Sequence, residues 1–169
     1  MRTTVVTAIA AAVASASFAS ADLITLSFPI TVEQSVPAPD VTGFSPSGDG
    51  VVTLDTDTNL FSWTISYQGL TGPIVAPGAH FHGPADFGQT AGVEVFISTG
   101  SPAEPPTSVL TGSATLTSQQ ASDVLAGLWY VNIHTARNGA GEIRGQVVPA
   151  PAAVATLAGA GLLTTRRRR

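Results

Sequence analysis

Three histidines are the residues of this chain best suited to chemistry, and they lie in two short apolar runs. His80 and His82 occur in "AHFHGPADFG", and His134 occurs in "YVNIHTARNG". Side chains alternate across a β-strand, so His80 and His82 share one face, about 6.6–7 Å apart. Two imidazoles at that spacing can reach one ion roughly 2.0 Å from each nitrogen, and a third from a neighbouring strand completes the set. The sequence therefore predicts candidate metal ligands at these three positions, with copper or zinc as the ion.

A purely structural role also explains the same histidines, and on the sequence alone it is the stronger of the two interpretations. A strand histidine often bonds only a nearby carbonyl and holds a loop in place. His82 leads into Gly83-Pro84, where it can tie down the turn. His134 leads into a hairpin turn with Asn138-Gly139, a pair that readily adopts positive φ. Both interpretations stay open.

Few charged residues lie near these runs. Glu94 or Glu142 could add an oxygen ligand, and the spacing favours neither. Arg144 could lie near the histidines, or it could form an ion pair with Glu142, two residues earlier on the same face of the expected strand.

Strand patterns dominate the chain between its two ends. Within residues 59–67, Phe61, Trp63, Ile65 and Tyr67 fall on one face and polar residues on the other, which indicates a half-buried strand. Trp63 and Trp129 are expected in the core. Further strands are expected at residues 23–32, 51–55, 79–82, 93–98, 108–116, 129–135 and 142–148, with loops at 35–50 and 98–108. Gly, Pro and Asp clusters between the runs predict an all-β antiparallel sandwich or barrel.

One short helix is expected after residue 116. Thr117 and Gln120 form a capping-box pattern, and Gly127 is placed to end the helix. Apolar residues at helical spacing predict its buried face: Ala121, Val124, Leu125 and Leu128. This helix is expected to close one end of the sandwich.

The N-terminal residues 1–21 have the pattern of a secretory signal peptide. Arg2 precedes an apolar stretch at residues 5–13, and a small-residue segment ends in Ala19-Ser20-Ala21. The small residues Ala19 and Ala21 predict cleavage by signal peptidase, so that the mature chain begins near Asp22.

The C-terminal residues 149–169 have three parts: Pro149 and Pro151, an apolar stretch at 152–163, and four closing arginines, Arg166, Arg167, Arg168 and Arg169. Twelve helical residues cover roughly 18 Å, less than a bilayer core of about 30 Å. The tail therefore predicts a transient membrane association with the arginines on the cytoplasmic side. The layout resembles the PEP-CTERM sorting signal, with Ala150 in place of the glutamate, which implies processing by an exosortase-like enzyme.

Between these ends, residues 22–148 suit one domain. This body holds two arginines, Arg137 and Arg144, against all eleven acidic residues, a formal charge of −9. Such a charge disfavours nucleic acid, because phosphate binding relies on Lys and Arg. The chain has no cysteine, which excludes disulfides, thiol catalysis and thiolate-bound metal.

Two segments carry a resemblance to a known family. "AHFHGPA" and, about fifty residues on, "GLWYVNIHTARNGAGEIRGQ" resemble the motifs of the CHRD domain, over roughly residues 51–148. The family is named from chordin, an extracellular protein, and is widespread in bacterial secreted proteins. The resemblance implies an immunoglobulin-like β-barrel distantly similar to copper/zinc superoxide dismutase. It matches His80 and His82 to a copper-binding His-x-His pair of that enzyme and His134 to a further copper ligand. Three histidines cannot supply both of its metal sites, so dismutase activity is not expected.

These features predict an exported, envelope-sorted or extracellular protein that binds an unknown surface polymer or protein without catalysis. The alternative is a histidine-based copper or zinc module. A hydrolase fits less well, since the chain has neither a Gly-x-Ser-x-Gly elbow nor a His-Glu-x-x-His motif. Asp55 and Asp57 are expected to be turn residues, and the "DTDTN" run lacks the glycine and glutamate of a calcium loop.

Overall fold

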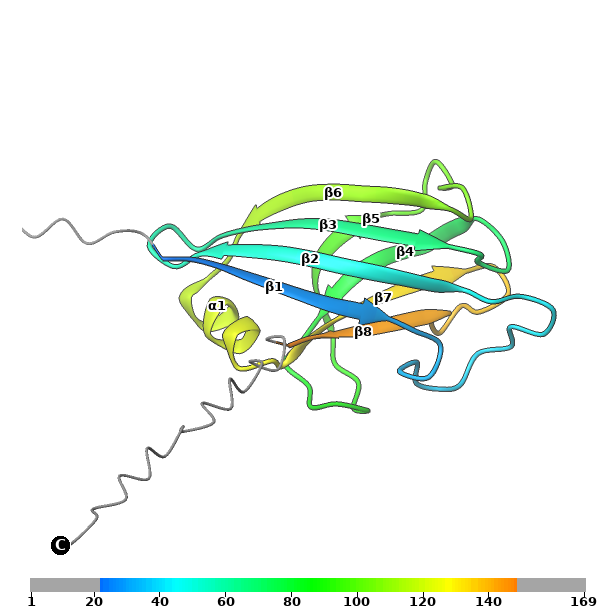
Figure 1. The fold of residues 1–169 in the computed structure, drawn as a ribbon, viewed down its shortest axis with the longest axis horizontal. Helices are drawn as coiled ribbons and strands as arrows, with labels where there is room; N and C mark the ends of the chain where they lie inside the picture. The colour runs from blue at the N-terminus through cyan, green and yellow to red at the C-terminus, as the bar shows by residue number, and fades with distance from the viewer. Residues whose placement is uncertain (1–21, 149–169) are drawn as a thin grey trace, which may run out of the picture.

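The computed structural model describes residues 22–148, which form two four-stranded antiparallel sheets facing each other (Figure 1). The first sheet has the order β1-β2-β3-β6, formed by β1 (Leu23–Ile30), β2 (Ser47–Asp55), β3 (Leu60–Gln68) and β6 (Ser108–Thr115). The second has the order β5-β4-β7-β8, formed by β5 (Val93–Ser98), β4 (Ile74–His82), β7 (Trp129–Thr135) and β8 (Ile143–Val147). The predicted all-β sandwich with one short helix is confirmed.

The two sheets bury an apolar core between them, and strand alternation decides which residues enter it. The expected apolar face of β3 is buried over its whole length, including Phe61 and Trp63. Phe61 packs edge-on against Phe81 of β4, with ring centroids 5.0 Å apart, and against Trp129 of β7, at 5.8 Å. Aromatic contacts therefore join the first sheet to the two strands that carry the histidines.

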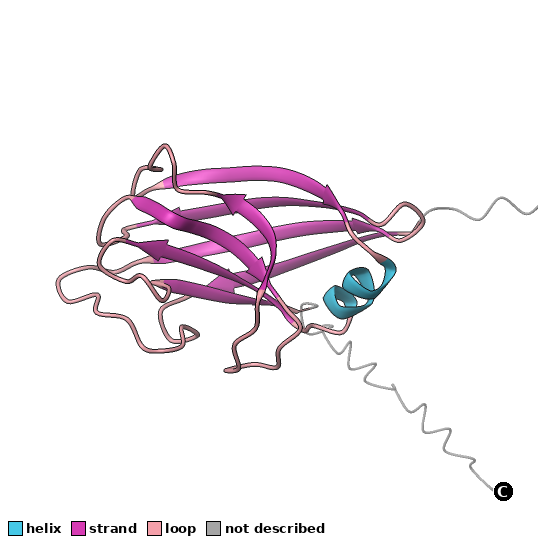
Figure 2. Cartoon of the chain, turned by 180° about the vertical axis from the view of Figure 1, so that it is seen from behind, coloured by secondary structure: helices cyan, strands magenta, loops and turns pink. Residues whose placement is uncertain are grey.

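The one helix, α1 (Ser118–Leu125), lies at one end of the sandwich (Figure 2). Its capping box is formed: the Gln120 N–H donates to Thr117 Oγ1 at 3.2 Å, and the Thr117 N–H donates to Gln120 Oε1 at 2.9 Å. Ala121 and Val124 are buried, but Leu125 is 38% exposed, so the buried face is narrower than its spacing predicted.

Two strands extend beyond their expected starts. β2 begins at Ser47, inside the expected loop. Its first residues, "SGDG", have the composition of a turn, yet they pair with β1 on one side and β3 on the other. Gly50 is required there, since a Cβ would come within 2.3 Å of the Phe28 ring. β4 begins at Ile74 rather than at residue 79. Asp55 is a turn residue as expected, accepting hydrogen bonds from the Asp57 and Thr58 N–H groups.

The outer faces of the two sheets have different environments. On the first sheet, outward residues such as Leu23 and Val51 are exposed. On the second, every residue of β7 and β8 is buried, whichever face it occupies. Loops lie over this outer face: Gln146 of β8 donates to the carbonyls of Ala85 and Gly127, and its N–H donates to Gln34 Oε1. The polar outer residues of this sheet therefore lie in a second, polar interior.

The predicted signal peptide and sorting tail lie outside the described residues. Among residues 22–148, no helix is long and apolar enough to cross a membrane.

The first prediction concerns Phe81, whose burial fixes the orientation of its two histidine neighbours. Phe81→Ala should lower the free energy of unfolding by about 3–5 kcal/mol, because it removes a buried aromatic ring at the centre of the core. Phe87→Ala, at an exposed phenylalanine, should change it by less than about 0.5 kcal/mol. Chemical denaturation measures both. Equal losses would contradict the assignment of Phe81 as the core anchor.

Candidate metal centre

The structure brings the three histidines together on the outer face of the second sheet. His80 and His82 of β4 lie opposite Asn132 and Tyr130 of β7, and His134 follows on the same face of β7. One ring nitrogen of each histidine lies within 4.8 Å of one from each of the others. The three side chains are only 2%, 9% and 6% exposed. The outer-face placement expected from alternation is thus observed, while the burial was not expected.

Each imidazole uses one nitrogen on a backbone carbonyl. His80 Nε2 lies 2.6 Å from the Pro77 oxygen, His82 Nδ1 lies 3.1 Å from the Ala91 oxygen and His134 Nδ1 lies 3.0 Å from the Gly139 oxygen. A carbonyl oxygen only accepts, so the proton of each ring must be on that nitrogen.

The other nitrogen of each ring has no partner. His80 Nδ1, His82 Nε2 and His134 Nε2 are all buried without a hydrogen-bond partner among the described residues. In a neutral ring whose proton is on the carbonyl side, this second nitrogen carries a lone pair. Three lone-pair donors are therefore placed together, one Nδ1 and two Nε2.

Burial keeps these rings neutral. It lowers the pKa of His80 to about 4, against the opposing hydrogen bond to Pro77 and with help from the neighbouring histidines. Burial also lowers the pKa of His82 and of His134. Neutral imidazole is the form that binds metal ions, so no proton has to be displaced near neutral pH.

A bulge in β4 places the carbonyl that receives His80. Between Ile74 and Ala79 the register with β7 shifts, so the intervening residues are not paired with β7. Gly78 has φ +104° there, and a Cβ on it would lie 2.0 Å from the Ser98 oxygen. Only glycine fits this point, and the resulting turn directs the Pro77 carbonyl onto the ring three residues later.

The loop after β4 holds His82 through Ala91. The carbonyl of Ala91 accepts from His82, and its N–H donates to the Tyr130 hydroxyl at 3.0 Å. The Tyr130 ring stacks on the His82 ring, with centroids 4.9 Å apart and planes 5° apart. Sequence reasoning missed Tyr130, although its position four residues before His134 places it on the same strand face.

The β7–β8 loop holds His134 through Gly139, and it is anchored by buried polar groups. Asn132 donates to the Ala140 carbonyl at 3.0 Å, and a Cβ on Gly141 would come within 2.1 Å of Asn132 Oδ1. Gly141, with φ +126°, is the loop residue in the left-handed region. The positive φ expected at Asn138-Gly139 was therefore wrong, because the close approach to Asn132 occurs two residues later.

Neither predicted carboxylate joins the histidine group. Glu142 is fully buried and accepts hydrogen bonds from Thr71, Thr135 and Asn138, including 2.6 Å from the Thr71 N–H and 2.8 Å from Asn138 Nδ2. Glu94 Oε2 accepts from Gln120 Nε2 at 2.7 Å. The group of potential ligands contains histidines alone.

Arg144 lies close to the site but not against Glu142. Its guanidinium carbon lies 3.5 Å from the centroid of the Tyr130 ring, and Nη2 donates to Gln146 Oε1 at 3.2 Å. Of the two sequence-level alternatives for Arg144, the structure therefore shows the position near the site.

The separation of the nitrogens suits one ion after a small adjustment. Three nitrogens at about 2.0 Å from a central ion in a trigonal arrangement are roughly 3.5 Å apart. Starting from separations of up to 4.8 Å, the rings need to move together by about 1 Å. Rotation about side-chain torsions supplies a movement of this size without changing the strands.

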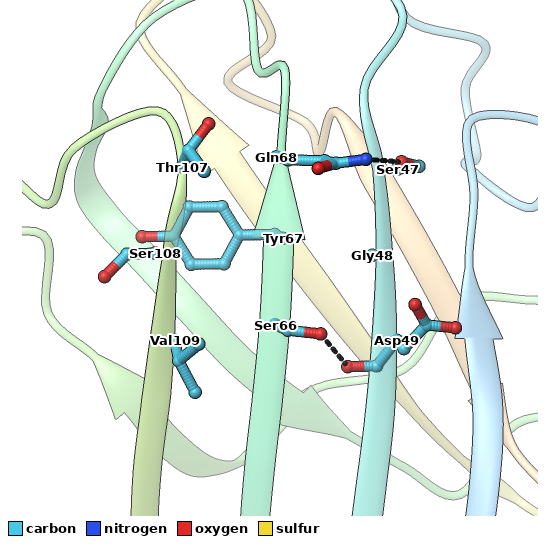
Figure 3. A pocket seen from close by; sticks show the side chains of 9 residues that line it. All are labelled: Ser47, Gly48, Asp49, Ser66, Tyr67, Gln68, Thr107, Ser108 and Val109. Atoms are coloured by element: carbon cyan, nitrogen blue, oxygen red, sulfur yellow. Dashed lines mark hydrogen bonds between the residues drawn. The ribbon is translucent and has the colours of Figure 1, made fainter.

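A shallow pocket of about 330 Å³ lies elsewhere, on the first sheet between β2, β3 and β6 (Figure 3). Figure 3 shows Ser66 donating to the Asp49 carbonyl and Gln68 donating to Ser47 Oγ across the strand pair. No histidine lines this pocket.

The described residues define a β-sandwich domain with a buried cluster of three histidines on one sheet. The CHRD domain model matches residues 26–147, which is most of the chain, and the chain belongs to the CHRD family. The match includes residues 26–30 of β1, a strand that the sequence motifs alone did not bring into the resemblance. No curated protein and no solved structure matches the chain.

The second prediction concerns pH. The pKa of His80 in the folded protein lies below its value in the unfolded chain, so the unfolded chain takes up a proton first as the pH falls. The contribution of neutral His80 to the free energy of unfolding is therefore complete above about pH 6.5 and is lost progressively toward pH 4. His80→Asn should remove part of this dependence, on the order of 1–2 kcal/mol, because solvent screens some of the charge. Denaturation of metal-free protein from pH 7 to pH 4 measures the difference. A variant with the wild-type slope would contradict the prediction.

The third prediction concerns Glu142, which anchors the loop that presents the Gly139 carbonyl. Glu142→Gln replaces a carboxylate oxygen that accepts hydrogen bonds by an amide N–H₂ that can only donate. This N–H₂ would face the donors Thr71, Thr135 and Asn138, so the free energy of unfolding should fall by about 2–3 kcal/mol. Amide hydrogen exchange in residues 136–142 should also become faster. Glu33→Gln, at an exposed carboxylate, is the matched control. Unchanged exchange in that loop would show that Glu142 does not anchor it.

Proposed function

We propose that this CHRD domain is a transition-metal-binding module in which His80, His82 and His134 hold one copper or zinc ion. The single observation that carries the proposal is the set of three buried ring nitrogens, one from each histidine, that have no hydrogen-bond partner within residues 22–148. A structural role accounts for the nitrogens bonded to carbonyls and leaves these three unexplained.

The surroundings of the rings support the same proposal. Metal-binding histidines almost always donate their second N–H to a carbonyl, a carboxylate or water, which fixes the tautomer and the ring orientation. All three rings do so here, and each carbonyl comes from a different segment: the β4 bulge, the loop after β4 and the β7–β8 loop. An ion bound to the rings would therefore also link these three segments.

Membership of the CHRD family supports a location outside the cytoplasm, since CHRD domains occur in extracellular proteins. Together with the signal peptide and sorting tail predicted from the sequence, this supports metal binding in the cell envelope or outside the cell. Binding of a surface polymer or protein stays a prediction from the sequence, because no described residues specify a partner.

The fourth prediction is the test of this function. Purified protein carrying no histidine tag should bind one equivalent of copper or zinc, and replacing any one of the three histidines by alanine should weaken binding by roughly 100-fold or more. Isothermal titration measures the affinities. Long-range ¹H–¹⁵N spectra of the zinc form should show coordination through Nδ1 of His80 and through Nε2 of His82 and His134.

Asp86→Asn, in the loop after β4, is the matched control. It removes an exposed charge from the same loop and should leave metal binding unchanged. Absence of binding by the wild-type protein, or binding that survives all three histidine substitutions, would overturn the proposed function.

A further inference from the structure

The charges around the histidine cluster bear on which ion it would hold. Resting on the metal-binding function proposed above, we propose that the site is selective for copper(I) over divalent ions and that Arg144 is a residue that sets this selectivity. Copper(I) carries a single charge and is satisfied by three nitrogen ligands, whereas zinc takes four ligands in most protein sites.

No negatively charged side chain belongs to the ligand group found among residues 22–148. Its members are three neutral imidazoles, and the carboxylates of Glu94 and Glu142 do not belong to it: each accepts hydrogen bonds from other residues, although the charge of Glu94 still acts on His82 and raises its pKa against the larger effect of burial. The cost of removing an ion from water rises with the square of its charge. A buried site built from neutral donors therefore penalises a divalent ion far more than a monovalent one.

A fixed positive charge, that of Arg144, lies beside the site. Arg144 is 2% exposed, and the only ion pair among residues 22–148 joins Arg137 to Asp40, so no carboxylate pairs with Arg144. Tyr130 lies on the middle strand, β7, with His82 on β4 and Arg144 on β8. The His82 imidazole and the Arg144 guanidinium both stack on the Tyr130 ring, so one aromatic ring separates the guanidinium from the proposed ligand His82. This charge repels a divalent ion twice as strongly as a monovalent one.

Aromatic rings pack against two of the three histidines. Phe96 of β5 packs edge-on against His80, with ring centroids 4.7 Å apart, and Tyr130 covers His82. These contacts add no further donor atom to the site. A divalent ion would have to recruit its remaining ligands from outside the cluster, while a three-coordinate copper(I) ion would need none.

The test compares affinities for copper(I) and zinc in the whole protein. Copper(I) affinity is measured without oxygen by competition with bicinchoninate, and zinc affinity by competition with a chromogenic chelator. The wild-type protein should bind copper(I) at least about 100-fold more tightly than zinc, and Arg144→Gln should reduce this ratio by roughly tenfold. Arg144→Lys, which keeps the charge, should preserve most of the ratio.

The outcomes separate the two proposals. Failure to bind either ion would overturn the metal-binding function and this inference with it. Stoichiometric binding through the histidines with equal or tighter zinc affinity in the wild type would overturn the selectivity alone, and this measurement requires no variant. Equal ratios in Arg144→Gln and Arg144→Lys would overturn the role of the Arg144 charge.

Discussion

The feature on which this structure depends is the burial of a polar sheet face. The outer side of β7 and β8 carries Asn132, His134, Arg144 and Gln146, yet none of them is exposed to solvent. A buried polar group is costly unless it is hydrogen-bonded, so the loops over this face must supply partners. They do so mainly through backbone carbonyls. Because a carbonyl can only accept, it satisfies the N–H of an imidazole and leaves the second nitrogen as a free donor of an electron pair. The tautomers and orientations of all three histidines follow from this arrangement.

The two sheets of the sandwich have separate roles for the same reason. In the first sheet, alternation places Phe61 and Trp63 in the core and leaves the opposite side to solvent, which is how an antiparallel sheet normally divides its residues. In the second sheet, the inward residues, such as Phe81 and Ile133, belong to the core, and the outward residues form a second interior beneath the loops. Packing in the core therefore determines the positions of the strands, and the strands determine the backbone positions from which the outward side chains extend. The loops then determine which hydrogen bonds those side chains make.

Much of the fold was accessible from the sequence because it depends on local periodicity. The alternation in β3, the capping box of α1 and the placement of the three histidines on outer faces were all predicted from spacing. The burial of those histidines was not, because it depends on how the β4 bulge and the two loops fold back over the rings with their carbonyls. The start of β2 was missed because the segment "SGDG", in which Gly50 makes room for Phe28, has the composition of a turn. The position of the left-handed residue at Gly141 was missed because a contact with Asn132 determines it.

Buried nitrogens without a hydrogen-bond partner among the described residues are not confined to the histidines. The indole nitrogens of Trp63 and Trp129 also lack partners among the described residues. Each is an isolated donor on a large ring whose burial in the core stabilises the fold by more than one missing hydrogen bond costs, roughly 1–3 kcal/mol. The three histidine nitrogens differ in kind: they are acceptors, and they come from two strands whose histidines each place one ring nitrogen within 4.8 Å of the others. Convergence of three lone pairs brings no benefit to folding, since lone pairs repel and none of the three accepts a hydrogen bond from residues 22–148. A positive ion is the partner that would satisfy all three at once, which is why their arrangement supports a binding site more strongly than a structural role.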